Sequence, residues 1–319
     1  MKKSQIFLAL DKCFKNIIPL KCHHFLTPLK KKISPYFAKT LSSIWCVTWQ
    51  CNFACPYCWQ LEEPQTYKIN DVISYREWLD VWKSISQHFD VITIGITGGE
   101  PFLFKDFIKL LTKLPDNITY DITSNLSLVN VEEFLSYEKI RQHCSGISCS
   151  FHPSNASNSK NYIDTFFEKV RKLTVLPSTK VNFVPAVSNL KFYKTLNEFC
   201  HKNRISLHVK KHIVLKNPLD NAPEEERIAN GIGSSDSSLC NKSNMHENVS
   251  CSAGLSHLAL FPNADVWPCY TKAALGENYL GNLLSGEFKF NTEYMDCSYY
   301  PSCWRVDYHN VNIVRKKKN

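Results

Sequence analysis

A chain of 319 residues that is 44% hydrophobic and 21% charged has the composition of a folded globular protein, with room for one large domain or two modest ones. No apolar run approaches the roughly 20 residues that span a bilayer, and "IFLAL" near the N-terminus is too short for a secretory signal. We therefore expect a cytoplasmic protein without a transmembrane segment. The net charge is +9, and most of the excess positive charge lies in residues 1–43 and 315–318.

Residues 1–43 form a basic N-terminal arm with nine lysines and one aspartate. Ile6, Leu10, Cys13 and Ile17 recur at helical spacing among these lysines. Such an arm is suited to contact an acidic partner, such as an acidic peptide, a nucleic acid or a membrane surface. The alternative is a solvated arm that packs loosely on the rest of the protein.

From residue 44 onward, short apolar runs alternate with segments of helical period. Apolar stripes that begin at Trp78, Phe107 and Ile163 predict helices between these runs. Strands interleaved with helices indicate an α/β fold with a parallel sheet and right-handed crossovers, although the pattern does not distinguish a partial barrel from an open sheet. The predicted strands are 43–49, 91–97, 118–124, 146–151, 181–187 and 206–210.

The alternation stops after residue 211. Residues 212–250 are rich in Ser, Asn and Gly and predict a linker between two domains. In residues 251–319, "LSHLALF", a turn at "PNAD" and "VWPCY" predict a β-hairpin.

Fourteen cysteines are more than packing requires. A disulfide framework is not expected in so large a chain without a secretory signal, so these thiols are predicted to be reduced. Cys51, Cys55 and Cys58 lie close together in "CNFACPYC". Three such thiols are consistent with free thiols, with a zinc site that needs a fourth ligand, or with an iron-sulfur cluster that keeps one iron open.

The motif "CNFACPYC" resembles the CxxxCxxC loop of the radical S-adenosylmethionine (radical SAM) enzymes, in which an aromatic residue such as Tyr57 precedes the third cysteine. The resemblance implies a 4Fe-4S cluster on Cys51, Cys55 and Cys58, with S-adenosylmethionine bound to the open iron. "TGGEP" at 97–101 is similar to the GGE motif of this family, which holds the amino group of the methionine moiety. Paired glycines let the main chain approach a ligand, and a glutamate accepts hydrogen bonds from an ammonium.

Two further motifs support the resemblance, "TSN" at 123–125 and "SFH" at 150–152. The GGE motif and these two motifs have plainer alternatives: an ordinary turn for the GGE sequence, strand-end capping for "TSN", and a loop histidine for His152. All four motifs follow the carboxyl ends of successive predicted strands, where α/β folds build their active sites. The predicted cofactor contacts are Tyr57, Gly98, Gly99, Glu100, Ser124, Asn125 and Ser150.

The resemblance implies a partial (β/α)6 TIM-type barrel over residues 44–211. It also implies that one electron cleaves S-adenosylmethionine and that the 5'-deoxyadenosyl radical abstracts a substrate hydrogen. No catalytic residue is assigned, and the family's adenine-contacting glycine pattern is not evident in "VNFVPAVSNL".

A second set of cysteines, in residues 251–319, resembles the auxiliary-cluster domain of the twitch or SPASM kind. Its ligands would be Cys251, Cys269, Cys297 and Cys303, which predicts a second 4Fe-4S cluster, with zinc or free thiols as the alternatives. Ala264 stands where the family pattern has a glycine, whereas "LGN" at 280–282 fits it. Cys240 could join this set, and the remaining cysteines are expected to be buried thiols.

These features predict a radical SAM oxidoreductase or maturase that modifies a peptide or protein side chain, with the basic arm engaging an acidic leader. Dehydrogenation of a small alcohol or sugar is the alternative substrate chemistry. In either case a flavodoxin or ferredoxin is the expected electron donor. From another class, a non-enzymatic zinc-binding interaction module is the competing interpretation.

Overall fold

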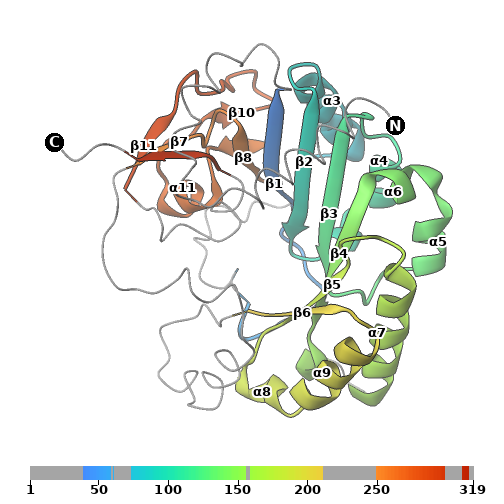
Figure 1. The fold of residues 1–319 in the computed structure, drawn as a ribbon. Helices are drawn as coiled ribbons and strands as arrows, with labels where there is room; N and C mark the ends of the chain where they lie inside the picture. Colours follow the sequence, from blue (N-terminus) through green and yellow to red (C-terminus); the bar gives the residue numbers. More distant parts are fainter. Residues whose placement is uncertain are drawn as a thin grey trace.

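The computed structural model describes residues 39–58, 60, 73–155, 159–210, 249–298 and 311–315. Six strands lie in chain order in one sheet, and each pairs in parallel with the next (Figure 1). They are β1 Thr40–Thr48, β2 Val91–Gly98, β3 Ile118–Ser124, β4 Cys144–Phe151, β5 Lys180–Phe183 and β6 Ser206–Val209. This order is that of a partial (β/α)6 barrel, as predicted.

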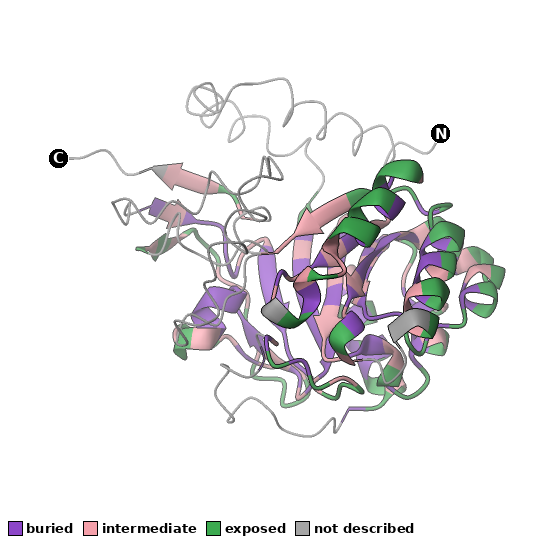
Figure 2. Cartoon of the chain, turned by 90° about the horizontal axis from the view of Figure 1, so that it is seen from below, coloured by how far each residue is buried: buried purple, intermediate pink, exposed green. Residues whose placement is uncertain are grey.

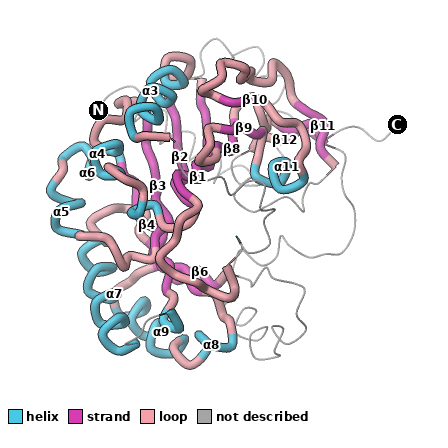
Figure 3. Tube along the Cα trace, turned by 180° about the vertical axis from the view of Figure 1, so that it is seen from behind, coloured by secondary structure: helices cyan, strands magenta, loops and turns pink. Residues whose placement is uncertain are grey.

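Helices connect these strands and gather along one side of the sheet (Figure 3). The first of them begins with a capping box, in which Ser74 Oγ accepts from Glu77 N and the Glu77 carboxylate accepts from Ser74 N. The helices are α3 Tyr75–Ser86, α4 Phe107–Leu111, α5 Val131–Ser136, α6 Glu138–His143, α7 Ser159–Leu173, α8 Val187–Leu190 and α9 Tyr193–Lys202, with 3-10 turns η5 Pro101–Leu103 and η6 Pro153–Asn155.

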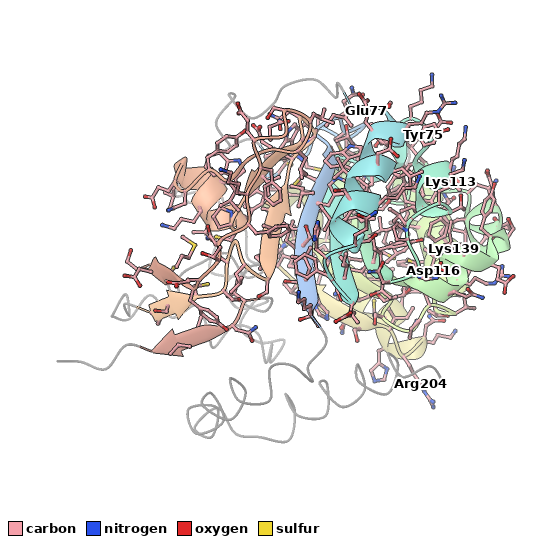
Figure 4. The ribbon with its side chains drawn as sticks, turned by 90° about the horizontal axis from the view of Figure 1, so that it is seen from above. Tyr75, Glu77, Lys113, Asp116, Lys139 and Arg204 are labelled. Atoms are coloured by element: carbon pink, nitrogen blue, oxygen red, sulfur yellow. The ribbon has the colours of Figure 1, made fainter. Side chains whose placement is uncertain are left out.

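The main hydrophobic core lies between the sheet and these helices. The apolar residues of β2, Ile92, Ile94 and Ile96, are fully buried in it, and the predicted stripes of α3, α4 and α7 pack in the same core. Figure 2 shows the strands as buried or intermediate, while the exposed residues lie mainly on the outer faces of the helices. Figure 4 shows Glu77, Lys113, Asp116 and Lys139 on this outer, helical side.

The predicted strand 181–187 was too long. In the structure β5 ends at Phe183, and Ala186 already precedes helix α8. Pro185 explains the early end, because proline has no N–H to donate to a sheet.

The hairpin predicted after the linker is confirmed, but it belongs to the large sheet. Strands β8 His257–Leu260 and β9 Asp265–Trp267 pair antiparallel, and β10 Gly281–Asn282 follows at the edge. β8 pairs in parallel with β1, so the hairpin extends the sheet beyond its first strand. Helix α11 Tyr270–Leu275 follows β9, and a separate three-stranded sheet has the order β11 Met295–Cys297, β7 Val249–Cys251, β12 Ile313–Arg315.

Several predictions fall outside the described residues. These are the conformation of most of the basic arm, most of the linker predicted over 212–250, and the positions of Cys240 and Cys303. The last two residues of that predicted linker, 249 and 250, already belong to β7. Within the described ranges, no helix has the length and apolar character needed to cross a membrane.

Candidate functional site

The four sequence motifs meet at the carboxyl edge of the parallel strands. The cysteine loop begins just after Thr48, the last residue of β1. Gly98 ends β2, Ser124 ends β3, and Ser150 is the last residue but one of β4. Because β1–β4 are adjacent and parallel, these ends lie side by side. The expectation that the motifs share one edge is confirmed.

The two glycines of the GGE motif allow the cysteine loop to approach the end of β2. Gly99 N donates to Thr48 O at 2.8 Å, and Glu100 N donates to Gln50 O at 2.8 Å. A Cβ on Gly98 would lie 2.2 Å from Thr48 O, and one on Gly99 would lie 2.0 Å from Gln50 O. Gly98 also has φ of +123°, which disfavours a side chain. The two glycines therefore let the start of the cysteine loop pack against the end of β2. From the sequence, they were predicted to let the main chain approach a ligand.

Glu100 is fully buried and binds the end of β3. Its carboxylate accepts from Ser124 Oγ at 2.8 Å, from Asn125 N at 2.8 Å and from Phe102 N at 3.2 Å. Burial raises the pKa of Glu100, and these three hydrogen bonds oppose the rise. Glu100 and Ser124, predicted as two separate cofactor contacts, are thus partners of each other. Their contacts with a cofactor remain predictions.

Asn125 connects the cysteine loop to β3. Its Nδ2 donates to Asn52 Oδ1 at 3.0 Å, and its Oδ1 accepts from Ser127 N and Ser127 Oγ at 2.9 and 2.6 Å. Asn52 Nδ2 in turn donates to Ser127 Oγ at 2.8 Å. This closed network fixes the loop beside Cys51, whose thiol accepts from Phe53 N at 3.4 Å.

The three thiols of the loop differ in environment. Cys55 is buried, Cys58 is half-buried and Cys51 is exposed, and none is in a disulfide. Burial raises the pKa of Cys55 to about 12, and the nearby charges of Cys58 and Cys51 add to the rise. Burial likewise raises the pKa of Cys51. Thiols in this state become thiolates only with a compensating positive charge such as that of bound iron.

Three reduced thiols within eight residues are the soft donor set that an iron-sulfur cluster takes. They fit the group that the sequence predicts by chemistry and by position. In the described part of the chain, however, no three His, Cys, Asp or Glu side chains are grouped closely enough to hold a metal ion. The ligand roles of Cys51, Cys55 and Cys58 therefore stay predictions.

Residues after β4 cover Cys55. Asn155 Nδ2 donates to Cys55 Sγ at 3.0 Å. The Tyr57 hydroxyl lies 3.2 Å from His152 Nδ1 and 3.4 Å from Ser154 Oγ, and burial raises the pKa of Tyr57 to about 12. Tyr57 is only 6% exposed, so its side chain packs against the end of β4. Its predicted contact with the cofactor remains untested.

The sequence reading missed Asn52 and Asn155 as supports of the loop. Both stand next to quoted motifs, in "CNFACPYC" and just after "SFH". An amide side chain at a strand end was the available signal, because such residues commonly bond nearby backbone and side-chain groups. Ser150, predicted to face the cofactor, is half-buried and pairs with Asn182 of β5.

Cys251, Cys269 and Cys297 lie in one cluster beside the three-stranded sheet. Cys251 ends β7 and Cys297 ends β11. Because the strands are antiparallel, Cys251 is opposite Met295 and Cys297 is opposite Val249, so the two cysteines lie diagonally across the pair. Cys269 precedes α11, and its Sγ accepts from Lys272 N at 3.4 Å. Three of the four predicted auxiliary ligands therefore belong to one cluster, although among the described residues their side chains are not grouped closely enough to hold a metal ion.

Ala264, where the family pattern has a glycine, has φ of +65° and is fully buried in the turn between β8 and β9. A positive φ is the conformation that favours glycine. Ala264 therefore adopts a backbone conformation that favours glycine, although it carries a Cβ.

Comparisons with known proteins agree with this geometry. The sequence profile of the Radical SAM superfamily matches residues 45–173, which include the cysteine loop and all three other motifs. A probable GTP 3',8-cyclase of Methanocaldococcus jannaschii is 26% identical over 183 residues, which are 54% of this chain and 59% of that protein. The chain thus spans about three fifths of the length of that relative.

Two solved structures share the fold. Streptococcus suis SuiB bound to S-adenosylmethionine has a TM-score of 0.54 at 15% identity, over 89% of this chain and 74% of SuiB. anSMEcpe with bound AdoMet and Cp18Cys peptide has a TM-score of 0.53 at 17% identity, over 79% of this chain and 81% of that one. Residues 45–173 are a radical SAM domain, and enzymes of the Radical SAM superfamily use a 4Fe-4S cluster and S-adenosylmethionine as cofactors.

Proposed function

We propose that this chain is a radical SAM enzyme that modifies a peptide or protein side chain. The observation that carries the proposal is the loop of Cys51, Cys55 and Cys58, which is fastened to the GGE turn at the carboxyl edge of the barrel. These three cysteines would hold the 4Fe-4S cluster. S-adenosylmethionine would be bound by the backbone of Gly98 and Gly99, by Glu100, and by the residues at the ends of β3 and β4.

When bound, the cluster and S-adenosylmethionine supply a 5'-deoxyadenosyl radical that removes hydrogen from carbon. The chain's own task is to position the cofactor and the substrate and to exclude water. Glu100 fixes the end of β3 through Ser124 and Asn125, and Asn125 fixes the cysteine loop through Asn52. Asn155 and the N–H of Phe53 donate to loop sulfurs, which stabilises their negative charge.

We further propose an auxiliary 4Fe-4S cluster on Cys251, Cys269, Cys297 and Cys303, of the twitch or SPASM kind. The clustering of the first three supports it. The domain division that goes with this proposal is a barrel over 44–211, a linker over 212–250 and an auxiliary domain over 251–319. A flavodoxin or ferredoxin would supply the electron, and the arm over 1–43 would engage an acidic leader.

A peptide as the substrate is supported by likeness of fold, because one matching structure, anSMEcpe, holds a bound peptide. SuiB and peptide-bound anSMEcpe match most of this chain, including residues beyond the radical SAM domain. The relative named GTP 3',8-cyclase makes a nucleotide the second candidate, because it is 26% identical to this chain over 54% of the chain's length. A small alcohol or sugar remains the third.

The test begins with cofactor cleavage. The protein is reconstituted with iron and sulfide without oxygen, reduced, and assayed for 5'-deoxyadenosine from S-adenosylmethionine. Product from the parent protein and none from Cys55→Ala is expected, with Cys200→Ala as the control because Cys200 is a buried thiol of α9. Undiminished product from Cys55→Ala would remove the loop from the reaction.

The substrate is then assigned by comparing three additions, namely a candidate precursor peptide, GTP and a small polyol. A mass change in the peptide after turnover is the expected result. Conversion of GTP or of the polyol, with an unchanged peptide, would replace the peptide proposal and leave the radical SAM assignment intact.

A further inference from the structure

The inward face of the barrel strands is polar throughout β3–β6. On β3 the buried residues Ile118, Tyr120 and Ile122 face the helices, so Thr119, Asp121 and Thr123 face the opposite way. The strand register carries this face across the sheet, because Thr123 pairs with Ser148 and Ser148 pairs with Lys180. The inward residues of these strands are Thr119, Asp121, Thr123, Gly146, Ser148, Ser150, Lys180, Asn182, Ser206 and His208.

This composition is unusual for a barrel. The interior of a complete TIM barrel is filled by layers of branched apolar side chains. Here the apolar side chains of β3–β5 all face the helices, and the inward face has hydroxyls, an amide and two opposite charges. Polar groups deep in a fold are costly unless they find hydrogen-bond partners.

The two charges belong to Asp121 of β3 and Lys180 of β5. Burial raises the pKa of Asp121, and the positive charge of Lys180 opposes the rise. Gly95 of β2 leaves room beside the carboxylate, since Asp121 Oδ1 lies 3.8 Å from where a Cβ of Gly95 would be. No ion pair between Asp121 and Lys180 is formed among the described residues, so both groups keep capacity for a ligand.

The inward residues nearest the carboxyl ends of the strands lie beside the edge where the cofactor is predicted to bind. Ser150 pairs with Asn182, and Asn182 pairs with His208 of β6. Asn182 Oδ1 is shielded from solvent and has no hydrogen-bond partner in the described part of the chain. An unsatisfied buried acceptor is unfavourable, and a bound donor would remove that cost. Asn182 Oδ1, next to Ser150, is therefore an acceptor to which a ligand could donate a hydrogen bond.

We infer that Asp121, Lys180 and Asn182 form the substrate-recognition surface, and that it binds a polar peptide side chain with both hydrogen-bond donors and acceptors. The inference rests on the proposed peptide-modifying function and narrows its substrate class. Lys180 accommodates an acceptor, whereas Asp121 and Asn182 Oδ1 accommodate donors. An aliphatic or aromatic side chain would leave these three groups desolvated and unpaired, which disfavours it.

The test uses the oxidised, reconstituted full-length protein and capped tripeptides Gly-X-Gly with X as Ser, Asn, Lys, Leu or Phe. Binding is measured by saturation-transfer difference NMR. Tripeptides with Ser, Asn or Lys are expected to bind, and those with Leu or Phe are not. Asp121→Asn and Lys180→Met are each expected to weaken the binding of the polar tripeptides about tenfold, the effect of one charge-assisted hydrogen bond.

The matched control is the same chemical change on the outer surface, where Lys139 contacts Asp116 on the helical side (Figure 4). Asp116→Asn and Lys139→Met should leave tripeptide binding at the parent level. Equal binding of the Leu and Phe tripeptides, unaffected binding in the two inward variants, or no binding of any tripeptide would each overturn the inference. Deoxyadenosine formation by the same parent preparation reports separately on the radical SAM function.

Discussion

The side-chain amide of Asn155 donates a hydrogen bond of 3.0 Å to the sulfur of Cys55, across 100 residues of sequence. Asn155 ends the 3-10 turn η6 that follows β4, so this bond ties the end of β4 to the cysteine loop. Hydrogen bonds to ligand sulfurs stabilise the more negative, reduced state of an iron-sulfur cluster.

Replacing Asn155 with Ala should therefore lower the reduction potential of the loop cluster without loss of iron. The measurement is a redox titration followed by EPR on the anaerobic protein. Asn203→Ala is a suitable control, because Asn203 donates to Phe199 O at the end of α9 and is distant in sequence from the loop. Identical potentials in the Asn155 variant and the parent would mean that this bond does not reach a cluster ligand.

The close approach of the cysteine loop to the GGE turn predicts a strong effect of a single methyl group. In Gly99→Ala the new Cβ would lie 2.0 Å from Gln50 O, so the backbone of the GGE turn or of the cysteine loop must shift. We expect a loss of about 3 kcal/mol or more in the free energy of unfolding, as for other substitutions that force backbone displacement.

Gly95→Ala is the matched control on the same strand. Its Cβ would approach the end of the Ile44 side chain at 3.3 Å, its other contacts, with Asp121 Oδ1 at 3.8 Å and Ser43 O at 3.9 Å, are ordinary, and φ is not positive there. Urea unfolding of both variants and the parent checks the prediction. Equal stability of the two variants would show that the loop does not need the glycine.

His152 predicts a pH dependence of stability for the cluster-free protein. Burial lowers the pKa of His152 to about 4, from an ordinary value of 6.5. Below pH 6.5 the unfolded chain takes up a proton that the folded chain refuses, so stability is present above pH 6.5 and is lost as the pH falls toward 4. The loss attributable to this group is at most roughly 3 kcal/mol.

Urea unfolding at pH 7, 5.5 and 4 measures this effect. In His152→Gln, which does not titrate, the decrease between pH 7 and 4 should be smaller than in the parent. Parallel curves for parent and variant would indicate that His152 is protonated in the folded state as readily as in the unfolded one.

The cluster of Cys251, Cys269 and Cys297 predicts a separable iron site. Cys269→Ala should reduce the iron content by about one cluster while deoxyadenosine formation partly survives, because Cys269 clusters with Cys251 and Cys297 of the three-stranded sheet and not with the loop that follows β1. Cys149→Ala, which removes a buried thiol of β4, should keep the iron content of the parent. Iron analysis after anaerobic reconstitution decides, and equal iron in all three proteins would eliminate a cluster at Cys269.

Much of the barrel was predictable because each strand and helix has its own periodic apolar pattern. The stripe that begins at Trp78 and the alternation around Ile118 determine which face is buried, whatever the neighbours are. Pairing between distant segments has no such local signature. The contact of β1 with β8 joins Ser42 to His257, 215 positions apart, and only the folded chain shows it.

The site shows the same division between local and long-range information. Strand order places the four motifs at one edge, as the sequence predicted. The partner of Glu100 was not predictable, because an acidic side chain after paired glycines has the same sequence signature whether it binds a ligand or a neighbouring strand. Its hydrogen bonds to Ser124 and Asn125 became visible only when the ends of β2 and β3 were adjacent.

The most direct test of the central claim is electron-nuclear double resonance on the reduced protein with S-adenosylmethionine labelled with ¹⁵N in its amino group and ¹⁷O in its carboxylate. If Cys51, Cys55 and Cys58 hold a cluster with one open iron, both labels should couple to the cluster spin, and the coupling should vanish in Cys55→Ala. A cluster signal in the parent without coupling to either label would contradict the account.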